Sequence, residues 1–380
     1  MTARKQHRIY LDFNASTPLA PEVAEAMQQL LREPFGNPSS DHWAGQPARK
    51  AVEKARSQAA ALLGCTPEEV VFTSGGSESN NHALKGVFFA HERSGVHIIT
   101  SQVEHPAIIN PCRFLERLGA ELTYLPVDHF GRINPDDVRR GIRPRTKLIS
   151  IMHANNEVGT IQPIADVARI AQEHGILFHT DAAQSVGKIS TRVDELGVDL
   201  LSVAGHKMYG PKGMGALYVR DGVRLEPLIH GAGHENGRRA GTENILLEIG
   251  LGAACALAES WVGMEPVRQL RDVFWQQLQE RFGRAVVLNG HPDERLPNTL
   301  NVSFVGKVGS EILARMKDVA ASTGSACHSG SVELSPVLKA MKIPVEVGMG
   351  AIRFSLGRTT SREEVEAAVS LLTAAVCGLP

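Results

Sequence analysis

Paired cysteines are missing from this sequence. The five cysteines are an odd number, and no two of them form a C-x-x-C pair. Because disulfide frameworks and zinc sites need such pairs, the spacing argues against both, and we predict no metal site. The cysteines lie far apart in the chain, at Cys65, Cys112, Cys255, Cys327 and Cys377.

An excess of charge of one sign is also missing. The chain of 380 residues has 40 Lys and Arg against 41 Asp and Glu, a net charge of -1. This balance argues against direct binding to nucleic acid or to an anionic membrane. No apolar run is long enough to span a bilayer, and the N-terminus lacks the hydrophobic stretch of a secretion signal. We therefore expect a cytoplasmic protein with neither nucleic acid nor membrane as a direct partner.

Short apolar runs alternate with helical patterns through the first two thirds of the chain. The helical stretches around 105–119 and 163–175 each end on a glycine. This alternation predicts an α/β fold with a mainly parallel sheet, helices on both faces and a ligand site at the carboxyl ends of the strands. The runs that predict strands are EEVVFT, VHIITS, TKLISIM, GILFHTDAA, VDLLSVA and GALYV.

The pattern changes after about residue 260. A long amphipathic helix is expected over 266–283, strands at TLNVSF and GAIRFSLG, and a last helix that begins at SREE with a Ser/Glu capping signature. We predict a large domain over 15–259 and a smaller α+β domain made of 1–14 and 260–380.

Three stretches indicate chemistry. In VVFTSGGSESNN a strand and a glycine turn precede a helix, so that Gly76, Ser77 and the first helical amides can bind a single phosphate. Asp181 follows a predicted buried strand, where a carboxylate caps a helix or pairs with a cation, and Gln184 follows three residues later. Lys207 lies on a constrained turn in GHKMYGPKG, where burial and positive neighbours would lower its pKa.

These three elements are what pyridoxal 5'-phosphate requires, namely a phosphate site, a carboxylate for the ring nitrogen and a lysine for the aldehyde. The chain resembles the cysteine desulfurases of the nitrogen-fixation and iron-sulfur-cluster type, within fold-type I of the pyridoxal-phosphate enzymes. The resemblance implies the seven-stranded sheet of that fold in the large domain. The matching motifs are YLDFNASTP, GNPSS, FTSGGSESNN, EH, HANNEVG, HTDAAQSVGK, GHKMYGPKG, RRAGTEN, STGSAC and IRFSLGR.

The resemblance implies a role for each matching residue. Lys207 would bind the cofactor aldehyde covalently, Asp181 would pair with the ring nitrogen, and His105 would stack on the ring and transfer protons. Gln184 would bond the phenolic oxygen, with Asn156 between that oxygen and the substrate carboxylate. The remaining ligands would be Arg353 for the carboxylate, and Gly76, Ser77, His206 and the partner subunit's Thr242 for the phosphate of a homodimer.

Cys327 lies in DVAASTGSACHSGS, where small polar neighbours predict an exposed loop. By itself the stretch favours a free surface thiol over a reactive one. The resemblance implies that Cys327 takes sulfur from L-cysteine as a persulfide, releases alanine and passes the sulfur to an acceptor protein. The chain departs from the family at Ala204, where many members have a serine that contacts the phosphate.

Other assignments remain open at this point. YLDFNAS, the GSACHSG loop and the short C-terminal end resemble the desulfurase of bacterial DNA phosphorothioation, and the N-terminal half resembles selenocysteine lyases. A class V aminotransferase without sulfur transfer would share Lys207, Asp181 and the phosphate turn but would not need Cys327. A cofactor-free interaction protein would require a decayed site.

Overall fold

The computed structural model describes the chain in five segments. The segments are residues 8–31, 35–91, 95–323, 327–328 and 331–378.

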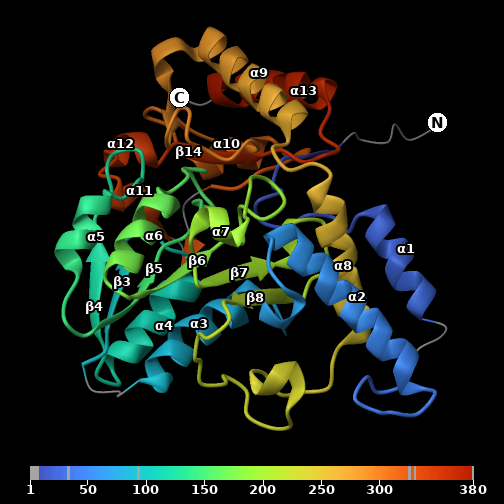
Figure 1. The fold of residues 1–380 in the computed structure, drawn as a ribbon. Helices are drawn as coiled ribbons and strands as arrows, with labels where there is room; N and C mark the ends of the chain where they lie inside the picture. Colours follow the sequence, from blue (N-terminus) through green and yellow to red (C-terminus); the bar gives the residue numbers. More distant parts are fainter. Residues whose placement is uncertain (1–7, 32–34, 92–94, 324–326, 329–330, 379–380) are drawn as a thin grey trace.

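A seven-stranded sheet forms the centre of the larger part of the molecule (Figure 1). Only β8 runs antiparallel to its two neighbours, and the remaining neighbouring pairs are parallel. In spatial order the strands are β2 (Val70–Thr73), β8 (Gly215–Val219), β7 (Leu200–Ala204), β6 (Leu177–Asp181), β5 (Thr146–Ser150), β3 (His97–Ser101) and β4 (Glu121–Leu125).

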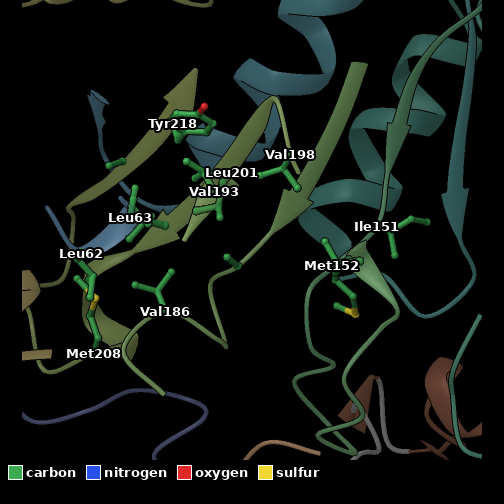
Figure 2. Close-up of a cluster of buried hydrophobic side chains, with 14 of the residues drawn as sticks. Leu62, Leu63, Ile151, Met152, Val186, Val193, Val198, Leu201, Met208 and Tyr218 are labelled. Atoms are coloured by element: carbon green, nitrogen blue, oxygen red, sulfur yellow. The ribbon is translucent and has the colours of Figure 1, made fainter. Parts of the chain in front are cut away.

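Helices cover both faces of this sheet. Helices α3 and α4 pack on one face through a cluster that contains Phe88 and Leu115, while α2 and α6 pack on the other. Figure 2 shows Leu62 and Leu63 of α2 in the hydrophobic cluster on this other face, near Leu201. The helices are α1 (Pro21–Leu30), α2 (Gly45–Leu63), α3 (Gly76–Ala90), α4 (Pro106–Glu116), α5 (Pro135–Gly141), α6 (Ile164–Glu173), α7 (Val193–Leu196) and α8 (Ile245–Glu259).

A second core cluster is built from the two ends of the chain. It includes Leu11, Phe274 and Phe354, and Figure 1 shows α9 and α13 side by side there. A three-stranded antiparallel sheet lies in the order β14 (Ala351–Ser355), β10 (Thr299–Phe304) and β9 (Val286–Asn289). The helices are α9 (Glu265–Phe282), α10 (Gly309–Arg315), α11 (Pro336–Ala340), α12 (Val345–Gly348) and α13 (Arg362–Cys377).

Short elements complete the chain. Strand β1 (Ile9–Tyr10) pairs in parallel with β11 (Val319–Ala320), so the N-terminal segment lies beside the C-terminal third. The hairpin of β12 (Cys327–His328) and β13 (Ser331–Val332) is antiparallel. Single 3-10 turns form η1 (Pro67–Glu69), η2 (Gly205–Lys207), η3 (His234–Gly237) and η4 (Gly283–Ala285).

The predicted α/β architecture is confirmed, including the mainly parallel sheet of seven strands. Ser361 caps α13 and Glu364 bonds back to its amide, as the capping signature predicts. Edge strand β4 was not predicted, because most of its residues are exposed or half-buried and form no apolar run. The division into domains at 15–259 and at 1–14 with 260–380 stays a prediction.

Candidate active site

A cavity of about 680 Å³ opens at the carboxyl ends of the parallel strands. Side chains from β6, β14 and the turns after β2, β3 and β7 meet there, although they are far apart in sequence. The cavity brings together nine of the predicted site residues, namely Gly76, Ser77, His105, Asn156, Asp181, Gln184, His206, Lys207 and Arg353.

Lys207 ends the 3-10 turn that follows β7. Its Nζ donates to the main-chain oxygens of Asn14 at 2.6 Å and Ala15 at 2.8 Å. Burial first, and the positive charge of Arg353 second, lower the pKa of Lys207 to about 8. A neutral amine is therefore accessible near neutral pH, which is what nucleophilic addition to a carbonyl requires.

The backbone beyond Lys207 is strained in a way that holds this turn. Tyr209 has a φ of 64°, in the left-handed region that residues with a side chain rarely adopt. Its amide donates to Thr17 Oγ1 at 2.7 Å, and its hydroxyl accepts the amide of Arg358 at 2.8 Å. These bonds compensate for the strain and fix where Lys207 leaves the main chain.

Asp181 is the last residue of β6 and is 6% exposed. Its Oδ1 accepts the amide of Ala183 at 2.9 Å, and its Oδ2 accepts Nδ2 of Asn80 at 2.7 Å. Asn80 lies on α3, so two elements fix the carboxylate at the cavity wall. The Oδ1 of Asn80 is buried without a hydrogen-bond partner among the described residues.

His105 caps the N-terminus of α4 through its ring. The amide of Ala107 donates to Nδ1 at 3.1 Å, which leaves Nε2 of a neutral ring to carry the proton. Burial lowers the pKa of His105, the charge of Asp181 raises it and that of Lys207 lowers it. The ring is thus neutral at ordinary pH while its surface stays exposed to the cavity.

Glu104 next to His105 is buried, and its carboxyl anchors the turn. Both oxygens accept the amide of Met152, and Ser101 Oγ donates at 2.7 Å. Burial raises the pKa of Glu104 to about 8. The buried carboxyl therefore ties the turn after β3 to the end of β5 and holds His105 in place.

The turn from β2 into α3 approaches the neighbouring strand closely. Gly75 has a φ of 142°, and a Cβ on Gly215 of β8 would lie 2.7 Å from its Cα. A Cβ on Gly76 would meet that of Ala204 at 3.3 Å. Glycines therefore leave the amides at the start of α3 open to the cavity, as an anion requires.

Arg353 reaches the cavity from β14. Its guanidinium donates to Asp12 Oδ1 at 2.7 Å and to the main-chain oxygen of Asn156 at 3.0 Å. The Nε of Arg353 is buried without a partner among the described residues. A half-engaged guanidinium of this kind can bind a carboxylate.

His206 and Gln184 complete the wall. Nδ1 of His206 lies 3.3 Å from Ser16 Oγ, and burial with the charge of Lys207 lowers the pKa of His206 to about 4. Nε2 of Gln184 donates to the main-chain oxygen of Asn14 at 2.9 Å.

Two predicted residues lie outside this cavity. Thr242 is exposed and lines a separate shallow hollow with Leu31 and Asn244. Cys327 belongs to β12 instead of lying wholly in a loop, and the position of its side chain lies outside the described residues.

Several supporting residues were not predicted as functional. Asn14 and Asn80 stand in the motifs YLDFNASTP and SGGSESNN, yet their partners are more than 100 residues away in sequence. Only the motif membership could have indicated them.

The lining fits pyridoxal 5'-phosphate. One end offers free helix amides, another a fixed carboxylate, and the amine of Lys207 faces the same space. The unpartnered Oδ1 of Asn80 and Nε of Arg353 show polar capacity that the chain itself leaves unused.

Comparison with known proteins gives consistent matches. The family model for class-V aminotransferases matches residues 9–368. The cysteine desulfurase IscS of Dictyoglomus turgidum is 52% identical over 97% of this chain and 94% of its own length. Among solved structures, a NifS-like protein has a TM-score of 0.92 at 36% identity, covering 98% of this chain and 100% of the other. The structure of SspA in complex with cysteine has a TM-score of 0.82 at 42% identity, covering 92% and 98%.

Proposed function

The chain belongs to the class-V aminotransferase family, and from its 52% identity to a cysteine desulfurase we propose that it is a pyridoxal-phosphate-dependent cysteine desulfurase. The reaction converts L-cysteine to L-alanine and leaves the sulfur on Cys327 as a persulfide. The C–S bond of the substrate breaks and an S–S bond forms, so the substrate carbon is reduced as the sulfur is oxidised. The resemblance to cysteine desulfurases, confirmed by the 52% identical relative, supports this reaction over a lyase for selenocysteine.

The arrangement of Lys207 carries the proposal. Its amine has a lowered pKa and faces the same cavity as the carboxylate of Asp181 and the first amides of α3. When bound, pyridoxal phosphate supplies a protonated ring that withdraws electrons from the α-carbon of the amino acid. Lys207 would hold the aldehyde carbon and later remove the α-proton, and Asp181 would keep the proton on the ring nitrogen.

The remaining lining residues would orient the two ligands. His105 would lie against the ring, and Gln184 would donate to its phenolic oxygen. Asn156 and Arg353 would bind the substrate carboxylate, which would compete with Asp12 for the guanidinium.

The phosphate would meet the amides of Gly76 and Ser77 together with His206. We also propose that Thr242 of a second copy completes this site in a homodimer. The exposed position of Thr242, away from the cavity of its own chain, supports this arrangement. Phe35 and Trp43 are 83% and 78% exposed and in edge contact, and an exposed aromatic pair of this kind favours burial against a second copy.

The sulfur acceptor would be another protein. The charge balance argues against direct transfer to nucleic acid. No helix in the described segments is long and apolar enough to cross a bilayer. Iron-sulfur assembly and DNA phosphorothioation both stay predictions for the pathway.

The experiment compares three purified proteins with pyridoxal phosphate and L-cysteine, namely wild type, Cys327→Ser and Cys377→Ala. Cys377 is a matched control because it is exposed and lies at the end of α13. Wild type and Cys377→Ala should turn yellow and release alanine and sulfur in equal amounts, whereas Cys327→Ser should turn yellow without forming a persulfide. A yellow wild type that makes a keto acid and no sulfide would contradict the proposal, and sedimentation of the same samples tests the dimer.

A further inference from the structure

Lys188 is a second buried amine close to the active site. It is 5% exposed and follows β6 in sequence, and no role in the mechanism above requires it. Burying an ammonium group is costly unless it is paired with a charge. The charged groups that act on Lys188 are Lys207 and Arg353, both of which are positive. Burial first, and then the positive charges of Lys207 and Arg353, lower the pKa of Lys188 to about 7. Ion pairing therefore does not explain why an amine stands here.

The contacts of Lys188 are two neutral carboxamides. Its Nζ donates to Oε1 of Gln184 at 3.0 Å and to Oδ1 of Asn14 at 3.2 Å. A carboxamide has one accepting end and one donating end. Because Nζ of Lys188 binds the side-chain oxygen of each carboxamide, the NH₂ groups of Gln184 and Asn14 must point away from Lys188.

The orientation of the Gln184 carboxamide decides whether this residue can donate to or accept from a ligand in the cavity. Its Nε2 donates to the main-chain oxygen of Asn14, the same oxygen that accepts Nζ of Lys207. While Lys188 is protonated it has no acceptor, so a flipped amide would place its NH₂ group against the ammonium protons and lose both bonds. Gln184 can thus face a cavity ligand only as a donor.

Asn14 is fixed in the same way. Its Oδ1 accepts from Lys188 and from Nδ2 of Asn298 at 3.0 Å. Its Nδ2 therefore turns to Thr299 Oγ1 at 2.8 Å and to the main-chain oxygen of Asn156 at 3.3 Å.

We propose that Lys188 is a positioning residue that fixes the carboxamide of Gln184 as a hydrogen-bond donor to the bound cofactor. It acts through Gln184 and Asn14 and touches neither cofactor nor substrate. The inference rests on the proposed function, because the ligand it concerns is the pyridoxal phosphate of that reaction.

The test follows the visible absorption of the pyridoxal-phosphate-loaded protein as pH is varied. A donor to the cofactor's oxygen stabilises the anionic form of that oxygen and lowers the pH midpoint of the band. Lys188→Met keeps an unbranched side chain and removes the amine with its donors, so the midpoint should rise by about one pH unit. Asn298→Leu is the matched control, because it removes the other donor to Asn14 Oδ1 without touching Gln184. Its midpoint should stay at the wild-type value.

A double-variant cycle separates positioning from a general loss of structure. In a Gln184→Ala background, Lys188→Met should cause no further shift of the midpoint. Lys188→Arg retains N–H donors and has no acceptor, so it should keep the wild-type midpoint. If Lys188→Met does not fold, Lys188→Leu, which also removes the donors, provides the test, and its midpoint should rise in the same way.

The outcomes distinguish this inference from the function on which it rests. A wild type that does not turn yellow with pyridoxal phosphate overturns the proposed function. A yellow wild type whose midpoint is unchanged by Lys188→Met, or a shift that persists without Gln184, overturns the positioning role alone.

Discussion

The lowered pKa of Lys207 predicts how readily the cofactor-free protein takes up pyridoxal phosphate. With a pKa of about 8, about one amine in four is neutral at about pH 7.5, against about one in a thousand for the ordinary value of 10.5. The second-order rate of uptake should therefore rise with pH and level off above about pH 8. The measurement mixes cofactor-free protein with pyridoxal phosphate and follows the visible band over a series of pH values.

Arg353→Gln tests the electrostatic part of this argument. The guanidinium lowers the pKa of Lys207, whereas Asp12 raises it. Removing the guanidinium also leaves Asp12 without its ion-pair partner, so both effects raise the pKa. A rise of about one unit would lower the neutral fraction, and with it the uptake rate at about pH 7.5, by about tenfold.

Arg358→Gln is the control, because its guanidinium stacks 3.8 Å from the ring centre of Trp261 and is not among the charges that act on Lys207. The pH midpoint of the uptake rate should be the same in Arg358→Gln as in wild type. Comparing the variants in this way also cancels any titration of pyridoxal phosphate itself. A wild-type midpoint near 10.5, or a midpoint that falls in Arg353→Gln, would refute the reasoning.

Two further changes probe the ion pair between Arg56 of α2 and Glu235 of η3, and the close approach of β8 to the turn before α3. Glu235→Gln should lower the free energy of unfolding by about 3 kcal/mol in urea denaturation, because its 4% exposed side chain accepts two bonds from Arg56, at 2.6 and 2.7 Å; an unchanged midpoint in urea would argue against a structural ion pair. Gly215→Ala should weaken pyridoxal phosphate binding at least tenfold, an order-of-magnitude loss of about 1.4 kcal/mol, because its Cβ would lie 2.4 Å from the oxygen of Val203 and 2.7 Å from Gly75. Equilibrium titration of the cofactor checks it, and wild-type affinity would show that the turn tolerates the shift.

The sequence predicts those parts of the fold whose pattern is local. The strand at 70–73 is a mainly apolar run and the strand at 299–304 alternates polar and apolar side chains; both are buried along their whole length and both patterns favour a strand. The direction of β8 depends on its pairing with β2, which no local pattern records.

The candidate site divides in the same way. Lys207, Asp181 and the glycines before α3 stand next to strands, where their chemistry can be inferred from neighbours in sequence. The role proposed for Lys188 depends on Gln184, four residues earlier, and on Asn14, 174 residues away, and no local pattern in the sequence shows that these two carboxamides meet one amine. Physical reasoning from sequence reaches the residues that do chemistry before it reaches those that hold them.

The bonds of Asn14 also set when the active site can exist. Its side chain bonds Thr299, 285 residues later, and its amide bonds Ser355 Oγ, 341 residues later. During synthesis, a ribosome-bound chain that has reached β8 already contains Lys207 and Asp181 but has no partner for these bonds. We therefore expect a nascent chain to acquire its full affinity for the cofactor only after β14 has emerged, so that loading follows translation.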